Sequence, residues 1–238
     1  MENYKIIKDE QKSQEFINWL PDLEDGQKFY VCLMARKKYG ATEGLKSDKS
    51  ILKRFTATKE QLINKIKKLE VEVGSYEVDG LTINQDSLAL YITPNPRDMH
   101  KAGLKTIQEL TKYLVEDRTI YNPQSIALNM IQVTGVKIFF DVDIDIIPNK
   151  TLNLNELCNL LMDKNVINAG AIKNRIITTR GGFHILVELD KISTYYKKSW
   201  FNNFSQLKDD RFTVMMNSDG LVPLVGCAQS NFIPKLFL

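Results

Sequence analysis

In the first half of the chain, segments whose apolar residues recur with the period of a helix alternate with short, continuous apolar runs. The run KFYVCLMA at 28–35 is rich in β-branched and aromatic residues, which is typical of a buried strand. The elements expected before residue 133 are helix 11–20, strand 28–35, an amphipathic helix opened by the capping box of Thr58 and Gln61, strand 88–92, a rigid turn at 93–98, helix 99–115, and a helix opened by Asn122 and Pro123. Residues 1–130 are therefore expected to form a mixed α/β module.

From Gly135 onward the pattern changes to a regular succession of short elements. These are strand 135–145, helix 153–164, strand 171–179, strand 183–189, helix 194–208 and strand 212–216. The order β-α-β-β-α-β is the plan of a ferredoxin-like or RNA-recognition-motif-like sheet with helices on one face. The predicted fold class is α+β, with such a sheet over residues 131–238 packed against the module at 1–130. The two modules together form one domain, with their boundary near 118–135.

The strand at 139–145 carries an acidic residue at every second position. Residues two apart on a strand share a face, so Asp141, Asp143 and Asp145 point one way and the apolar residues between them fill the buried face. Their Cα atoms are spaced by about 6.6 Å, so neighbouring carboxylates can converge on a divalent cation. Carboxylate oxygens suit Mg²⁺ or Mn²⁺. The alternative is a sheet edge whose acidic face merely keeps it soluble.

A glycine-containing turn, Thr179-Arg180-Gly181-Gly182-Phe183-His184, joins the next two strands. Glycines permit close backbone approach and leave amides available to phosphate oxygens. Alternation places His184 on the face opposite Phe183. Arg180 and His184 would then grip a triphosphate, whereas the alternative for His184 is a satisfied structural histidine.

Composition limits the other chemistries. The 238 residues carry 32 basic and 29 acidic side chains, a formal charge of +3, so nucleic-acid binding would need a local basic surface. Three cysteines without a C-x-x-C pair and two histidines argue against a structural zinc site or a disulfide framework. Without an apolar leader or a membrane-length apolar run, we expect a soluble, cytoplasmic protein in a reducing compartment, and a viral or plasmid origin is compatible with this.

A third acid, Asp219, stands before Gly220 and by itself would be an ordinary turn aspartate. Taken in order, Asp141-Val142-Asp143, the turn ending in His184, and Asp219 resemble the three motifs of the archaeo-eukaryotic primase superfamily of DNA primases and primase-polymerases. The segment from Pro223 to Gln229 is similar to the stretch that follows the third motif. The resemblance covers residues 135–230. It departs from the family at Ser218, where a hydrophobic residue is usual, and it lacks the frequent zinc-binding element.

The resemblance implies a template-directed nucleotidyltransferase that joins NTPs or dNTPs on single-stranded DNA. Asp141, Asp143 and Asp219 would hold two divalent ions, Mg²⁺ or Mn²⁺, which stabilise the attacking and leaving oxygens in phosphoryl transfer. The implied nucleotide-binding residues are Thr179, Arg180, Gly182 and His184. The apolar end of the chain suggests a fragment, and a C-terminal helicase or helical priming domain is an expected partner.

Candidate contacts to the template phosphates are basic residues of the first module, because arginine and lysine supply the salt-dependent part of affinity. They are Arg36, Lys37, Lys38 and Arg97. Arg97 is favoured because Pro96 holds it in a stiff turn at a helix start. A purely structural turn is the alternative there.

Three other functions remain open from the sequence. In an aspartate-based phosphatase Asp141 would be the nucleophile, but no doubly wound βα repeat surrounds it. In a glycosyltransferase the D-x-D motif would hold a nucleotide-sugar metal. A non-catalytic nucleic-acid-binding module would instead present aromatic residues on the exposed face of its sheet.

Overall fold

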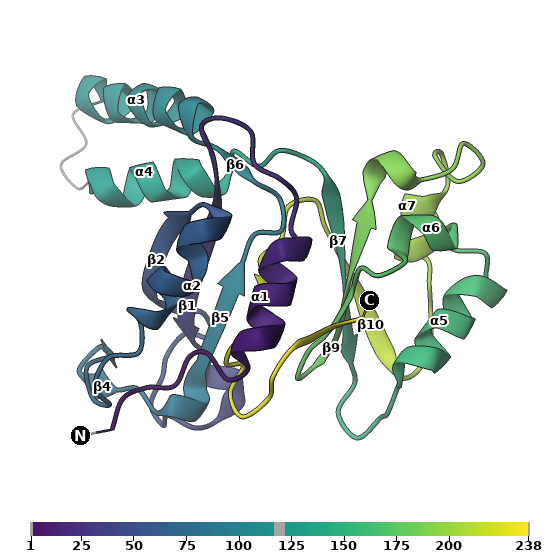
Figure 1. Ribbon diagram of the computed structural model, residues 1–238, viewed down its shortest axis with the longest axis horizontal. Helices are drawn as coiled ribbons and strands as arrows, with labels where there is room; N and C mark the ends of the chain where they lie inside the picture. Colours follow the sequence, from purple (N-terminus) through teal and green to yellow (C-terminus); the bar gives the residue numbers. More distant parts are fainter. Residues whose placement is uncertain (1, 117–121, 238) are drawn as a thin grey trace.

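The computed structural model describes residues 2–116 and 122–237 and contains two five-stranded sheets (Figure 1). Every strand pair in these residues is antiparallel. A separate short hairpin joins β3 (Glu77–Val78) to β4 (Leu81–Thr82). The predicted α+β class is therefore confirmed.

The first sheet is built on the strand predicted at 28–35. Its order is β11 (Val222–Pro223), β5 (Leu88–Ile92), β1 (Gln27–Ala35) and β2 (Ser50–Ala57), with β6 (Arg97–Asp98) paired to the start of β1. Strand β1 is buried on both faces. Phe29 and Val31 pack in the core with α1 (Glu10–Trp19) and α2 (Lys59–Lys67). Tyr30 and Cys32 pack on the other side with residues of α4 (Pro123–Gln132), which pairs with α3 (Met99–Val115).

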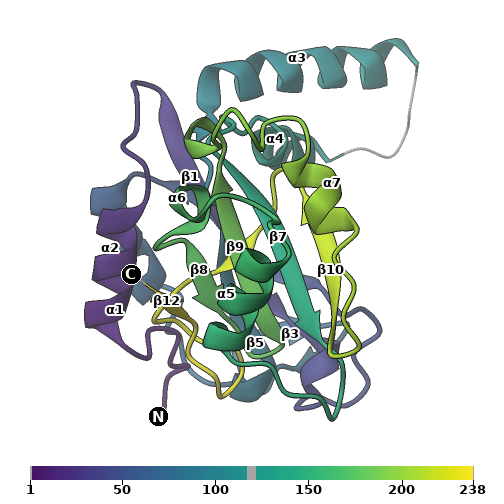
Figure 2. The ribbon, with the colours of Figure 1, turned by 90° about the vertical axis from the view of Figure 1, so that its right-hand side faces the viewer.

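The second sheet has the predicted β-α-β-β-α-β order. Its strands lie in the order β10 (Phe212–Asn217), β7 (Phe139–Ile146), β9 (Gly182–Glu188), β8 (Ile176–Thr178) and β12 (Lys235–Phe237). Figure 2 shows α5 (Leu154–Asp163), α6 (Ala169–Ile172) and α7 (Trp200–Ser205) on one face of this sheet. The opposite face turns toward the first sheet, where Trp19 of α1 stacks on Phe139 with ring centroids 5.5 Å apart.

Several elements differ from the sequence prediction. Strand β7 begins at Phe139 rather than at residue 135, and β3, β4, β6, β11 and β12 were not predicted. The strand expected at 171–179 begins only at Ile176, because Asn174 has a φ of 59° and the preceding apolar residues form the short helix α6. The helix expected at 194–208 is only Trp200–Ser205, where Trp200 and Phe204 turn one face to the core. Strand β2 was not predicted, since its half-exposed residues lack a strong apolar pattern. Short apolar runs do not distinguish a strand from a helical turn.

The chain crosses back to the first sheet after β10. Strand β11 pairs with β5, and the backbone of Cys227 forms an isolated β-bridge with that of Ile7. Strand β12 then returns to the second sheet beside β8. A division at residue 130 therefore does not separate the two sheets along the chain. In the part of the chain that the structure describes, no helix combines the length and apolarity needed to span a bilayer.

Candidate active site

The acidic strand β7 lies between β10 and β9, and its aspartates face the first sheet. Val142 and Ile144 are completely buried beneath the helices, as the alternation predicts. On the other face, the Asp141 side chain is 2% exposed and that of Asp143 is 22% exposed. Asp145 follows on the same face. The structure therefore confirms the predicted shared face of the three carboxylates.

His184 stands directly between the first two aspartates. It is the register partner of Asp143 across the β7–β9 ladder. Its Nδ1 lies 2.9 Å from Oδ1 of Asp141, and its Nε2 lies 3.6 Å from Oδ1 of Asp143. An imidazolium in this position offsets the charge of both carboxylates.

The pKa values of this cluster reflect its burial and its charges. Burial raises the pKa of Asp143 to about 6; the charge of His184 opposes this rise, while Asp145 and Asp141 add to it. Burial acts to lower the pKa of His184, but the charge and hydrogen bond of Asp141 outweigh it and raise that pKa to about 9. His184 is therefore protonated at neutral pH, and the carboxylates repel one another.

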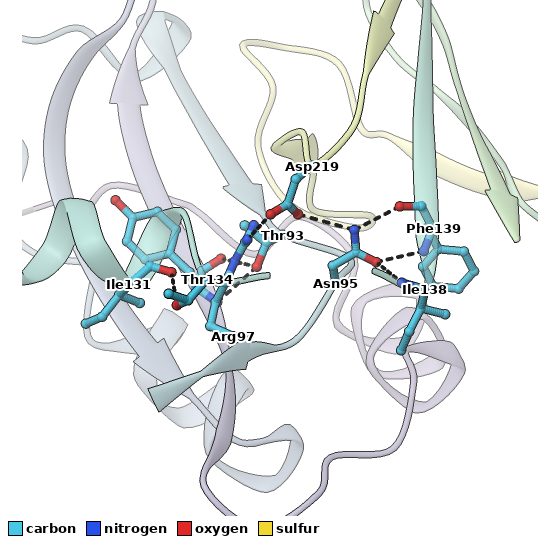
Figure 3. A network of polar contacts seen from close by, with 9 residues as sticks. Thr93, Asn95, Arg97, Ile131, Thr134, Ile138, Phe139 and Asp219 are labelled. Atoms are coloured by element: carbon cyan, nitrogen blue, oxygen red, sulfur yellow. Dashed lines mark hydrogen bonds and ion pairs between the residues drawn. The ribbon is translucent and has the colours of Figure 1, made fainter. Parts of the chain in front are cut away.

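Asp219, the third predicted carboxylate, lies in the turn that follows β10. Figure 3 shows it between the side chains of Arg97 and Asn95, both from the first module. Arg97 Nη1 forms an ion pair with Asp219 Oδ2, and Asn95 Nδ2 donates to Oδ1 at 3.2 Å. The next residue, Gly220, touches the acid strand, because a Cβ there would lie 2.6 Å from Oδ2 of Asp141. The turn thus links the first module to the acid pair.

The turn between β8 and β9 is held by its own threonine. Thr179 Oγ1 accepts from the amides of Gly181 at 3.3 Å and Gly182 at 3.1 Å. The expectation that these amides are free for phosphate is therefore wrong in this structure. Gly182 is required for another reason, since a Cβ there would lie 1.9 Å from the carbonyl oxygen of Ile144. Gln229 Oε1 braces the turn by accepting from the Arg180 amide at 2.8 Å.

A cavity of about 910 Å³ lies between the two sheets, and we call it the intersheet cleft. Seven of the predicted site residues line it, namely Arg36, Lys38, Asp143, Thr179, Arg180, His184 and Asp219. Asp141 lies beside this group, in contact with His184 and Gly220. Gly182 lines a neighbouring pocket instead. The fold therefore brings residues from four distant segments to one cavity.

The first module supplies a wall of arginine and tyrosine to the intersheet cleft. The Arg36 side chain is 6% exposed, lies 2.8 Å from Asp48, and sits 5.4 Å from the ring centre of Tyr91. The guanidinium of Arg180 stacks 4.5 Å from the ring centre of Tyr39. Sequence reasoning missed both tyrosines, Gln229 and Asn95 as site residues. The similarity at 223–229 was a usable signal for Gln229, whereas nothing in the pattern marked the tyrosines.

The predicted template contacts divide into different environments. Lys38 lines the intersheet cleft, and Lys37 is exposed outside it. Arg97 is 0% exposed and paired with Asp219, so it does not present its charge to a nucleic acid. The structure contradicts a template contact by Arg97 and assigns it a place in the support of Asp219. The sequence showed a rigid turn there but not that the chain buries it.

The carboxylates in and beside the intersheet cleft are suitable ligands for a divalent cation. Carboxylate oxygens are the donors that Mg²⁺ and Mn²⁺ prefer, and a cation would relieve the repulsion around Asp143. Within residues 2–116 and 122–237, however, no three His, Cys, Asp or Glu side chains already surround a common metal position. Asp141 and Asp143 are the first candidates as ligands, with Asp219 on the same cleft.

Comparison with known proteins adds no relative. No protein-family model, curated protein or solved structure matches this chain. The geometry of the intersheet cleft therefore carries the functional proposal.

Proposed function

We propose that this chain is the catalytic core of a DNA primase or primase-polymerase of the archaeo-eukaryotic primase superfamily, a template-directed nucleotidyltransferase. One observation carries the proposal: residues from all three resembling motifs, together with Lys38, line one intersheet cleft. Its volume of about 910 Å³ is in the range of small-molecule and cofactor sites. The strand order β10-β7-β9-β8 agrees with the sheet expected for such a core.

In this mechanism the acids and the basic residues have separate tasks. Asp141, Asp143 and Asp219 would hold Mg²⁺ or Mn²⁺, which supplies activation of a 3′-hydroxyl and neutralisation of the phosphates. Arg180 and His184 bind the triphosphate of the incoming nucleotide and offset its charge. No covalent nucleophile is needed, because the transfer is an in-line displacement on phosphorus.

The proposed partners follow from the charge of the cleft. Lys38 lies on the wall that faces the acids, where phosphates of nucleotide or single-stranded DNA template would pass, whereas Arg36 is buried in that wall and paired with Asp48. NTPs, dNTPs or both are the proposed substrates. A C-terminal helicase or helical priming domain remains part of the proposal as a partner.

The rival functions find less support. A doubly wound phosphatase has a parallel sheet, whereas every pair in the described strands is antiparallel. A non-catalytic nucleic-acid-binding sheet would present aromatic residues, whereas this face presents Asp141, Asp143 and Asp145, which repel phosphate unless a cation neutralises them. Nothing in the described residues specifically favours a nucleotide-sugar transferase.

The test is incorporation of labelled nucleotides on single-stranded DNA with Mg²⁺ or Mn²⁺. NTPs are compared with dNTPs, and primed with unprimed template. Product should require metal and template and should disappear in an Asp141→Asn/Asp143→Asn double variant. Asp79→Asn is the matched control, because Asp79 is an exposed acid paired with Lys46 on the surface. A folded protein that yields no product under any of these conditions would contradict the proposal.

A further inference from the structure

Arg97 is a buried charge with a single ion-pair partner among the described residues. It is the largest of the fully buried side chains in the described chain. Its ion pair is with Asp219, and its Nε and Nη2 atoms have no hydrogen-bond partner among the described residues. A buried guanidinium is costly unless it is paired, so the position of Asp219 and the burial of Arg97 depend on each other.

Asn95 connects the same carboxylate to the acid strand. Its Nδ2 donates to the carbonyl oxygen of Phe139 at 2.9 Å and to Asp219 Oδ1 at 3.2 Å. Its Oδ1 accepts from the amides of Ile138 at 3.1 Å and Phe139 at 2.8 Å. One amide side chain that is 1% exposed therefore uses all its hydrogen-bonding groups on the start of β7 and on Asp219 (Figure 3).

Glycines at two points keep this network tight. A Cβ at Gly135 would lie 2.1 Å from Asp219 Oδ2 and 2.4 Å from Arg97 Nη1. A Cβ at Gly220 would lie 2.6 Å from Asp141 Oδ2. Gly135 thus packs directly against the Arg97–Asp219 pair, and Gly220 places the backbone beside Asp219 against Asp141 of the acid strand.

We propose that Asn95 and Arg97 are positioning residues that fix the Asp219 carboxylate relative to the Asp141 and Asp143 pair. This inference rests on the proposed function, in which Asp219 is a metal ligand. Arg97 and Asn95 hold one oxygen each of Asp219, and Asn95 holds the strand start two residues before Asp141. Residues that orient a metal ligand typically change metal affinity about 10- to 100-fold when they are removed.

The simpler alternative is that Asp219 serves only as the counter-ion of Arg97. The two possibilities differ in a double variant. Removing both charges by Arg97→Met/Asp219→Asn leaves no unpaired buried charge, so it should recover stability lost in either single variant. If Asp219 is also a ligand, the double variant should regain thermal stability without regaining Mn²⁺ affinity.

The experiment measures melting temperature and Mn²⁺ affinity by calorimetry, with nucleotide incorporation as a third measurement. Arg97→Met and Asp219→Asn should each weaken Mn²⁺ binding about tenfold or more. Arg97→Lys, which keeps the charge but not the planar fork, should lie between wild type and Arg97→Met. The matched control is Arg211→Met/Asp209→Asn, which removes another arginine–aspartate pair whose atoms lie 2.8 Å apart. This control should keep wild-type Mn²⁺ affinity.

Gly135→Ala provides an independent perturbation if the charge variants do not fold. It retains both charges but places a Cβ against the Arg97–Asp219 pair, so it should also weaken Mn²⁺ binding. Wild-type Mn²⁺ affinity in folded Arg97→Met or folded Gly135→Ala would overturn the positioning role. Wild-type Mn²⁺ affinity in Asp219→Asn or in the Arg97→Met/Asp219→Asn variant would show that Asp219 is only the counter-ion of Arg97, which also overturns it. If wild type binds Mn²⁺ but incorporates no nucleotide, the polymerase proposal fails, while these affinities still decide the role of Arg97.

Discussion

Replacing His184 with glutamine should remove a large pH dependence of stability between pH 6.5 and about 9. His184 lies between Asp141 and Asp143, with its two ring nitrogens 2.9 and 3.6 Å from their oxygens. Glutamine keeps a polar group of similar length but cannot carry the positive charge. The substitution therefore isolates the charge of the imidazolium from its volume.

The magnitude follows from the two pKa values. The pKa of His184 rises from an ordinary value of 6.5 to about 9 in the folded protein, since the Asp141 charge and hydrogen bond outweigh burial. The folded state binds the proton more tightly, so this stabilisation is full below pH 6.5 and is lost as the pH rises through about 9. The shift corresponds to about 3 kcal/mol of unfolding free energy. The raised pKa of Asp143 affects stability at lower pH, between the ordinary pKa of 3.8 and about 6.

The assay is denaturant unfolding at several pH values in this window, in the presence of a metal chelator. Trp19 and Trp200 report on unfolding by fluorescence, since Trp19 of α1 stacks on Phe139 between the two sheets and Trp200 packs against Phe140 on the helix-covered face of the second sheet. Wild type should lose about 3 kcal/mol of unfolding free energy across the window.

His100→Gln is the control for this experiment. His100 is the other of the two histidines and is exposed on α3, so its loss should leave the wild-type pH dependence unchanged. If the His184→Gln variant keeps the wild-type slope, or if His100→Gln removes it, the reasoning about the buried imidazolium is refuted.

Two further substitutions test the glycine turn. Gly182→Ala should destabilise the protein by about 1–3 kcal/mol, seen as a lower denaturant midpoint, because its Cβ would lie 1.9 Å from the Ile144 carbonyl oxygen. Gly103→Ala is the control, because Gly103 lies in helix α3 and a Cβ there would meet no atom within 4 Å. This variant should be as stable as wild type or more stable by up to about 1 kcal/mol. A Gly103→Ala variant less stable than Gly182→Ala would contradict the argument. Gln229→Ala should raise the KM for nucleotide about fivefold with an unchanged circular dichroism spectrum, since it removes the acceptor of the Arg180 amide. An unchanged KM in steady-state incorporation would show that this brace does not matter to binding.

Local patterns in the sequence were sufficient for several features of the fold. The helix at 99–115 was predicted with its observed bounds, and Asp98 caps it through the Lys101 amide at 2.8 Å. The alternation along 139–146 correctly placed the aspartates opposite Val142 and Ile144. Capping and side-chain alternation depend on residues only two to four apart, so they can be recognised without the rest of the chain.

Tertiary structure decided which charges are buried and what they contact. Arginine is a residue type expected at the surface, yet Arg97 is buried against Asp219, which lies 122 positions away in the sequence. Asn95 likewise contacts partners that lie 43 to 124 residues away in the sequence. Gln229 contacts the Arg180 amide, 49 residues away. The sequence by itself determined the acid strand and its face. The burial and pairing of Asp219, Arg97 and Asn95 arose only when two sheets packed together, because solvent exclusion and hydrogen-bond partners across the intersheet cleft are properties of the packed chain.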